Sequence, residues 1–289
     1  MKKITIDGNG ICSRMSYLFT EISGIYPITP SSTMAENVDK MASKGEKNFF
    51  NDSVKVVEMQ SEAGAAGMVH GALVSGCLAT TYTASQGLLL MIPNMYKMAG
   101  EMLPAVFHVA ARSLSTHALS IMGDHQDVYA VRSTGFAMLA SSSVQDIAYL
   151  TPIAHLSAIA SSIPFLHFFD GFRTSHEINK INMLEREDLD GLIDERALMN
   201  FRKRAINPKN PNIRGTNQND DIYFQLTEAR NKDYENLVDI VEKYMSEINK
   251  IAGTNYKPFN YYGKKNAKKV IVAMGSVCDT IKEVIDHTE

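Results

Sequence analysis

The sequence predicts an α/β fold: a doubly wound, mostly parallel sheet with helices on both faces. Short apolar stretches that are typical of buried strands alternate along the chain with longer stretches of helical periodicity. Strands that alternate with helices pair in parallel through right-handed crossovers, and this places helices on both faces of the sheet. The 289 residues, 45% of them hydrophobic, are enough for a large core. We expect one such domain over residues 1–258, with a helical and loop extension from about residue 177.

The elements follow one another in a regular order. Strands are predicted where apolar or β-branched stretches lie between turn residues, and helices where apolar residues recur with a period of about 3.6. These criteria give strands over residues 24–26, 54–57, 77–83, 103–111, 136–140 and 164–169. They give a helix that begins at Glu62, and further helices over residues 8–21, 33–44, 88–99, 143–159, 192–204 and 234–251.

Two prolines fix the chain after the first of these strands. Pro27 and Pro30 exclude regular structure between them, so this segment must be an extended turn. Thr29 is thereby held just past the strand end. Ser31 or Ser32 can then cap the next helix.

A helix built of small residues begins at Glu62. Gly64, Gly67 and Gly71 recur at helical spacing, although each glycine costs roughly 1 kcal/mol relative to alanine. Their missing side chains let another backbone or a flat ligand approach the helix closely. The Glu62 carboxylate either interacts with the helix dipole or hydrogen-bonds a ring nitrogen of a heterocyclic cofactor. From the pattern alone, the first role is the commoner.

Polar residues follow several strand ends closely, namely Thr29, Glu62, Ser85, Arg112 and Asp170. The carboxyl ends of parallel strands meet at one edge of the sheet, where ligands bind in such folds. We therefore expect these side chains to share one rim. Arg112 is either a surface cation or a fixed anion site, since a guanidinium grips a carboxylate as a two-point fork.

Composition and motifs exclude several classes of partner. The net charge of −3 gives no long-range attraction for nucleic acid or acidic membranes, and no stretch approaches the roughly 18 apolar residues of a membrane span. The three cysteines, Cys12, Cys77 and Cys278, form no Cys-x-x-Cys pair and are expected to be buried thiols in a reducing compartment. Residues 123–127 predict a hydrogen-bonded turn, because their acids and histidine are too close along the chain for a specific metal site. No metal ligand is assigned.

The carboxyl-terminal residues are expected to leave the first domain. Residues 207–221 form a loop that is too long for a simple connector, and we expect it to pack over the domain or contact a neighbour. Within 259–289 we predict a linker, a buried strand over 269–276 and a helix over 278–286. One strand and one helix cannot bury both faces of the strand, so we expect a second, truncated α/β domain and a chain that is a fragment of a larger protein.

Five motifs occur in order along the chain: YPITPSS at 26–32, EMQSEAGA at 58–65, TASQG at 83–87, GDHQD at 123–127 and FFDGFRTSHE at 168–177. Together they closely resemble the N-terminal part of the pyruvate:ferredoxin (flavodoxin) oxidoreductase family, nearly end to end. The resemblance implies the pyrimidine-side domain for thiamine diphosphate. It implies that Glu62 is catalytic and that Thr29 and Arg112 bind the substrate. It implies cofactor contacts at Glu62, Gly64, Ser85 and Gln86.

The resemblance also implies an activity: oxidative decarboxylation of pyruvate with coenzyme A to acetyl-CoA and carbon dioxide, with electrons passing to ferredoxin or flavodoxin. The family's later domains hold Mg²⁺ with the diphosphate and three 4Fe-4S clusters. This chain offers only the ring end of the cofactor, so alone it is expected to be inactive. A homodimer is implied, in the cytoplasm or in a fermentative organelle such as a hydrogenosome. Two alternatives stay open: the front end of a pyruvate:NADP oxidoreductase fusion, and a non-catalytic truncated relative that acts as an interaction module.

Overall fold

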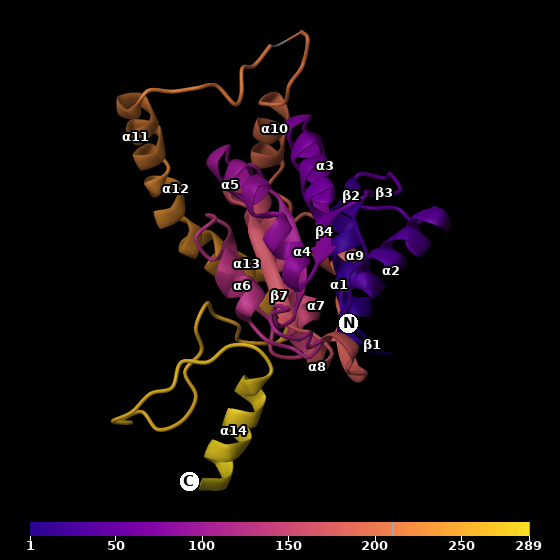
Figure 1. Ribbon diagram of the computed structural model, residues 1–289. Coiled ribbons are helices and arrows are strands. Elements are labelled where there is room, and N and C mark those ends of the chain that lie inside the picture. Colours follow the sequence, from indigo (N-terminus) through magenta and orange to yellow (C-terminus); the bar gives the residue numbers. More distant parts are fainter. Residues whose placement is uncertain (210, 289) are drawn as a thin grey trace.

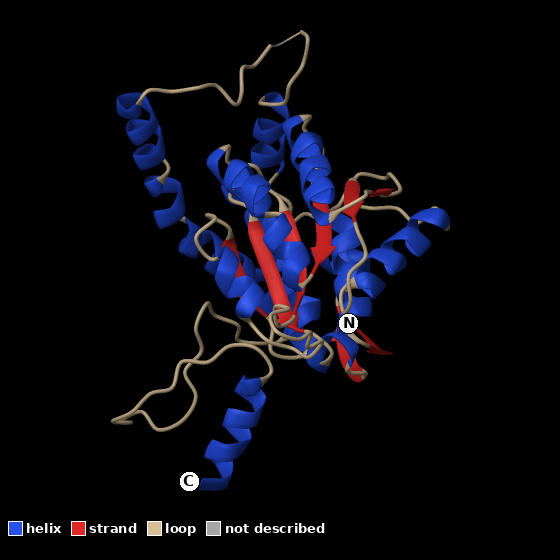
Figure 2. Cartoon of the chain, in the orientation of Figure 1, coloured by secondary structure: helices blue, strands red, loops and turns tan. Residues whose placement is uncertain are grey.

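The computed structural model describes residues 1–209 and 211–288. Within these residues a six-stranded sheet lies between helices, as the sequence predicts (Figure 1, Figure 2). The strand order is β3-β2-β4-β5-β7-β6, and all paired neighbours run parallel. The strands are β2 (Ile22–Ile25), β3 (Lys55–Glu58), β4 (Ala79–Thr83), β5 (Val106–Ala111), β6 (Ala137–Ala140) and β7 (Phe165–Asp170).

The larger helices divide between the two faces of the sheet. One face is covered by α1 (Gly8–Phe19), α2 (Ser32–Ser43), α7 (Val144–Ser161) and α13 (Leu237–Ala252). The other is covered by α3 (Glu62–Val74), α4 (Ser85–Leu90), α5 (Ile92–Gly100), α6 (Gln126–Val131) and α10 (Glu195–Lys203). Successive residues of β5 alternate between the two cores: Val106 and Ala110 lie in the first, Phe107 and Val109 in the second. Because both faces are covered, the strand is apolar on both sides except at His108, which is also buried.

The direction in which the chain crosses the sheet decides which face each helix covers. From β2 to β3 and from β6 to β7 the chain moves toward the β3 edge of the sheet, through α2 and α7. From β3 to β4, from β4 to β5 and from β5 to β6 it moves toward the β6 edge, through helices on the opposite face. The neighbours β2 and β4 therefore send their chains to opposite faces. Ligands of open α/β sheets bind outside the carboxyl ends of strands at such a reversal.

Several short elements were not predicted from the sequence. β1 (Lys2–Ile6) pairs antiparallel with β8 (Asn179–Met183) in a separate two-stranded sheet. Both strands are polar and short, so only their pairing makes them strands. The helices missed are α6 (Gln126–Val131), α8 (Arg173–His176), α9 (Arg186–Leu189), α11 (Asp220–Ala229) and α12 (Asn231–Glu235). No helix in the described part of the chain is both long and apolar enough to cross a membrane.

The helix predicted over residues 88–99 is two helices, α4 and α5, which meet at Met91. Pro93 stands in the first turn of α5. A proline ring clashes with the carbonyl four positions earlier and removes an N–H donor, so one continuous helix cannot pass through it. The break leaves α4 as a short helix directly after β4.

The strand predicted over residues 269–276 is wrong for the chain as described. No described strand pairs with this segment, and Val270, Ile271 and Val272 are 64%, 76% and 86% exposed. A strand needs neighbours that satisfy its backbone groups and cover its side chains, and this segment has none here. The helix that follows is confirmed as α14 (Val277–Thr288), which buries no residue and projects from the body of the molecule (Figure 1).

The close approach predicted at α3 involves a different glycine. A Cβ on Gly67 or Gly71 would meet no atom within 4 Å, so no described residue packs closely against these two glycines. A Cβ on Gly24 of β2 would lie 2.6 Å from Cε of Met68 and 2.9 Å from the carbonyl oxygen of Ala65. The missing side chain that lets strand and helix pack closely is therefore on β2.

We expect Gly24→Ala to lower the free energy of unfolding by roughly 1 to 3 kcal/mol, because the new methyl group overlaps a backbone carbonyl of α3. Gly71→Ala is the matched control. Its methyl group meets nothing and alanine is the better helix former, so this change raises the free energy of unfolding by up to about 1 kcal/mol. Urea unfolding followed by circular dichroism measures both variants. Equal effects would contradict the packing described here.

Candidate functional site

The loops after β2, β4 and β5 meet at the carboxyl edge of the sheet. Arg112, the residue after β5, lies between the other two loops and is 7% exposed. Its Nη1 donates to the carbonyl oxygen of Thr29 at 2.6 Å, and its Nη2 donates to Oε1 of Gln86 at 3.2 Å. Burial lowers the pKa of Arg112, against the opposite effect of the Asp127 carboxylate. The structure thus brings three of the residues selected from the sequence into direct contact.

The turn after β2 presents a carbonyl group, rather than a hydroxyl, to this guanidinium, and the residue Thr29 is exposed. Asn9 of α1 donates through Nδ2 to the carbonyl oxygen of Pro30 at 2.8 Å. The Ser31 hydroxyl donates to the carbonyl oxygen of Ile28 at 2.7 Å instead of capping α2. These bonds hold the turn that the two prolines impose.

A buried carboxylate joins the loops after β4 and β5. Oδ2 of Asp127, in α6, accepts from the N–H of Ser85 at 2.7 Å and from the N–H of Arg112 at 3.0 Å. Its Oδ1 accepts from the N–H of Val128 at 2.7 Å. Burial raises the pKa of Asp127 to about 6, although these three donors act to lower it. The segment predicted as a hydrogen-bonded turn therefore connects two loops of the rim.

Glu62 opens α3 as predicted and is 7% exposed. Ser61 caps the helix by accepting from the N–H of Gly64 at 3.1 Å. The Glu62 carboxylate makes no hydrogen bond or ion pair with residues 1–209 or 211–288. A Cβ on Gly87 would lie 2.7 Å from Oε1 of Glu62 and 2.7 Å from Oγ1 of Thr83, a buried hydroxyl that also has no described partner. The glycine after Gln86 thus leaves room for a carboxylate that can accept hydrogen bonds from a ligand.

A second cluster lies at the end of β7. Nε2 of His125 and Oδ1 of Asp170 are 2.6 Å apart, and Oδ2 of Asp170 accepts from the N–H of Ser276 at 2.9 Å and from its hydroxyl. The hydrogen bond to Asp170 raises the pKa of His125. Burial acts to raise the pKa of Asp170, but the bonds from His125 and Ser276 outweigh it and the pKa is lowered. Asp170 lies at the rim as predicted, but it binds the carboxyl-terminal segment beside a cavity of about 410 Å³.

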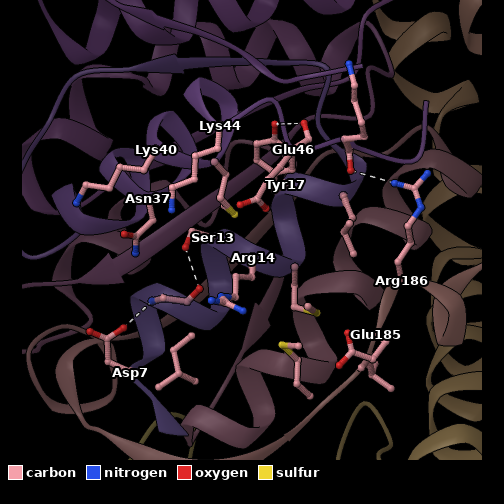
Figure 3. Close-up of a pocket in the computed structure, with 18 of the residues that line it drawn as sticks. Asp7, Ser13, Arg14, Tyr17, Asn37, Lys40, Lys44, Glu46, Glu185 and Arg186 are labelled. Carbon is pink, nitrogen blue, oxygen red and sulfur yellow. Dashed lines mark hydrogen bonds between the residues drawn. The ribbon is translucent and has the colours of Figure 1, made fainter. Parts of the chain in front are cut away.

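A larger cavity, of about 590 Å³, lies away from the rim among α1, α2 and β8 (Figure 3). Asp7 caps α1 there by accepting from the N–H of Gly10 at 2.6 Å, and Arg186 donates to the carbonyl oxygen of Asn48 at 2.7 Å. The charged side chains of its wall are of both signs: Asp7, Arg14, Lys40, Lys44, Lys47, Glu46, Glu185 and Arg186. None of the site residues selected from the sequence lines this cavity, so size alone does not locate the site.

Three buried histidines form a chain within the core. Nδ1 of His108 is 3.0 Å from Nδ1 of His167, and Nε2 of His108 is 3.1 Å from Nε2 of His155. Burial lowers the pKa of His155 and of His167 to about 3, so these rings are neutral. Cys12 lies close enough to His108 and His167 that their ligand atoms are within 4.8 Å of one another. We assign the cluster to the core because the rings already hydrogen-bond one another. Sequence reasoning missed it because only the fold brings these residues together.

The chain resembles known proteins over nearly all of its length. Residues 15–246 match the family model described as pyruvate flavodoxin/ferredoxin oxidoreductase, thiamine diphosphate-binding. A pyruvate-flavodoxin oxidoreductase from Klebsiella pneumoniae is 61% identical over 99% of this chain, which covers 24% of that protein. The pyruvate:ferredoxin oxidoreductase of Moorella thermoacetica is 56% identical with the same coverage. A pyruvate dehydrogenase [NADP(+)] from Cryptosporidium parvum is 50% identical over 99% of this chain and 15% of its own length.

A solved structure supports the fold. The 2-oxoglutarate:ferredoxin oxidoreductase from Magnetococcus marinus aligns with 99% of this chain and 51% of its own, with a TM-score of 0.66 and 17% identity. At that identity the likeness concerns the fold alone. The chain spans about a quarter of the length of the pyruvate-flavodoxin and pyruvate:ferredoxin oxidoreductases that it matches.

We expect Asp170→Asn to lower the pKa of His125 toward its ordinary value of about 6.5, because the variant replaces the charged acceptor that favours the imidazolium by a neutral amide. The His125 charge stabilises the fold fully below about pH 6.5, and this contribution is lost as the pH rises through the raised pKa. An NMR titration of the His125 ring measures the change. Asp124→Asn is the comparison, because Asp124 acts on His125 by charge alone and more weakly, so its removal should lower the pKa less. An unchanged His125 pKa in Asp170→Asn would contradict the pairing.

Proposed function

Because this chain belongs to the pyruvate flavodoxin/ferredoxin oxidoreductase family, in its thiamine diphosphate-binding part, we propose that it forms the ring-binding and substrate-binding part of an enzyme that oxidatively decarboxylates pyruvate with coenzyme A. The observation that carries this is the Glu62 carboxylate, 7% exposed and without a described partner. A carboxylate with no protein partner is free to accept hydrogen bonds from a ligand that donates them.

The cofactor supplies the stabilised carbanion, and the residues of this chain supply placement and charge. In this proposal Glu62 accepts a hydrogen bond from the aminopyrimidine ring. Gly64, Ser85 and Gln86 form the wall beside the ring. Thr29 and Arg112 receive the substrate, with the guanidinium gripping its carboxylate as a fork. The guanidinium uses two of its five N–H donors in the described bonds to Thr29 and Gln86, and its buried Nε has no described partner, so donors remain for a substrate oxygen.

The rest of the enzyme would supply what this chain does not offer. We assign to it the residues that would hold Mg²⁺ with the diphosphate, the iron–sulfur clusters and coenzyme A. Ferredoxin or flavodoxin would accept the electrons, and the assembled enzyme would be a homodimer. Residues 1–258 would form the pyrimidine-side domain, and residues 259–289 would begin the next one.

The pyruvate dehydrogenase [NADP(+)] relatives keep a second candidate open, in which NADP⁺ is the final acceptor. Sequence beyond this chain, with cluster-binding cysteines alone or with a flavin and NADP domain, distinguishes the two.

Glu62→Gln in the complete enzyme should slow the exchange of the C2 proton of bound thiamine diphosphate by roughly 10²-fold or more, since the amide cannot support the same proton transfer. The KM for pyruvate should change far less. Glu58→Gln is the matched control, because Glu58 is exposed and lies only four positions away. Proton–deuterium exchange followed by NMR measures the rate. Equal rates in Glu62→Gln and wild type would refute the assignment of Glu62.

The 289 residues alone should not oxidise pyruvate. A hydrogen bond to the ring and apolar contacts contribute a few kcal/mol at best, and association costs at least about 4 kcal/mol, so the affinity for thiamine diphosphate should be millimolar or weaker. Titration calorimetry with thiamine diphosphate and pyruvate-dependent dye reduction test this on the purified chain, with and without the remainder of the enzyme. Turnover by the chain alone would show that the proposed division of the cofactor site is wrong.

A further inference from the structure

Asp127 holds together parts of the rim that are distant in sequence. The side chain is fully buried, at 0% exposed. Its Oδ2 accepts from Ser85, 42 positions away, and from Arg112, 15 positions away. These residues belong to the loops after two neighbouring strands, β4 and β5, and neither loop has another carboxylate bonded to its backbone among the described contacts.

The hydrogen bonds form a closed ring. From Asp127 the ring runs to the N–H of Ser85. The Ser85 hydroxyl lies within hydrogen-bond distance of two acceptors, Oε1 of Gln86 and the carbonyl oxygen of Ser113, and it closes the ring when it donates to Oε1. That Oε1 accepts from Nη2 of Arg112, whose own N–H returns to Asp127. Ser85 adopts a φ of 50°, a left-handed conformation that is uncommon for residues with a side chain and persists only where its surroundings hold it. One carboxylate therefore fixes both ends of Arg112, directly at the backbone and through Ser85 and Gln86 at the guanidinium.

We propose that Asp127 is a positioning residue, which sets the place of the Arg112 guanidinium at the rim and thereby the affinity of the enzyme for its anionic substrate. The proposal rests on the function proposed above for Arg112. Asp127 itself is fully buried and does not touch the substrate.

The ring is strongest with the ionised form of the carboxylate. An ionised carboxylate accepts charge-assisted hydrogen bonds, whereas a protonated one keeps acceptor sites but loses the charge that strengthens these bonds. The charged groups that face Asp127 are Arg112, at the end of β5, and His125, which precedes α6 and is paired with Asp170. With the pKa of Asp127 at about 6, the carboxylate is ionised at neutral pH, and the bonds that it accepts weaken as the pH falls through that value.

This loosening differs from acid unfolding. Since the pKa of Asp127 is raised in the folded state, the folded chain binds this proton more tightly than the unfolded chain between about pH 4 and pH 6. Through this group, acidification stabilises the fold while it weakens the ring. A loss of substrate affinity near pH 6 without a fall in melting temperature therefore points to the ring.

The test compares Asp127→Asn with Asp124→Asn in the complete enzyme. Asp124 belongs to the same motif, but it is exposed and bonds only within its own turn. In wild type the KM for pyruvate should rise as the pH falls through about 6, with a smaller change in kcat. Asp127→Asn should raise this KM by about tenfold or more at pH 7 and abolish its pH dependence, because an amide places N–H groups against backbone donors. Asp124→Asn should behave as wild type.

Hydrogen exchange supplies a readout that does not depend on the reaction. Peptides that contain the amides of Ser85 and Arg112 should exchange faster in Asp127→Asn than in Asp124→Asn, and in wild type near pH 5.5 than near pH 7.5 after correction for intrinsic rates. The wild-type comparison needs no variant to fold.

Unchanged protection at these amides would overturn the positioning role, whatever the activity. Faster exchange with an unchanged KM for pyruvate would overturn the link to the substrate. Altered exchange in an enzyme that does not act on pyruvate would overturn the proposed function and keep the ring.

Discussion

Parallel pairing of β2 with β4 and of β4 with β5 is the constraint on which the candidate site depends. Parallel neighbours end at the same edge of the sheet, so their following loops meet there whatever their separation in sequence. In this way Arg112 reaches the carbonyl of Thr29, 83 positions earlier. The reversal of direction between β2 and β4 sends the chains to opposite faces and leaves this edge to polar groups.

The two charged groups of the rim are held in opposite ways. Arg112 is bonded on its backbone by Asp127 and on its guanidinium by Thr29 and Gln86. Glu62 has a capped helix behind it, but its carboxylate has no partner in the part of the chain that the structure describes. A ligand can therefore add a bond at Glu62. At Arg112 a ligand meets a guanidinium that the protein already holds in place and whose buried Nε has no described partner, so less side-chain ordering is needed on binding.

The sequence predicted those features that depend on local chemistry. Pro27 and Pro30 predicted the turn that carries Thr29, and periodicity predicted the strands and the helix that begins at Glu62. The sequence did not predict that Asp127 bonds two parts of the rim. Its partner Ser85 lies 42 positions away, and only the sheet brings the two residues together. The valines and isoleucine at 270–272 have high strand propensity, but no neighbouring strand pairs with them here. Propensity indicates what a segment can form, and pairing decides whether it does.

A crystal structure of the complete enzyme with thiamine diphosphate and pyruvate tests most directly whether this chain forms the ring and substrate site. We predict a nitrogen of the aminopyrimidine ring within about 2.6 to 3.2 Å of a Glu62 carboxylate oxygen, and the pyruvate carboxylate on the Arg112 guanidinium. The bonds from Ser85 and Arg112 to Asp127 should be unchanged. A cofactor ring bound away from Glu62, with that carboxylate paired to another protein group, would contradict the assignment of this rim as the site.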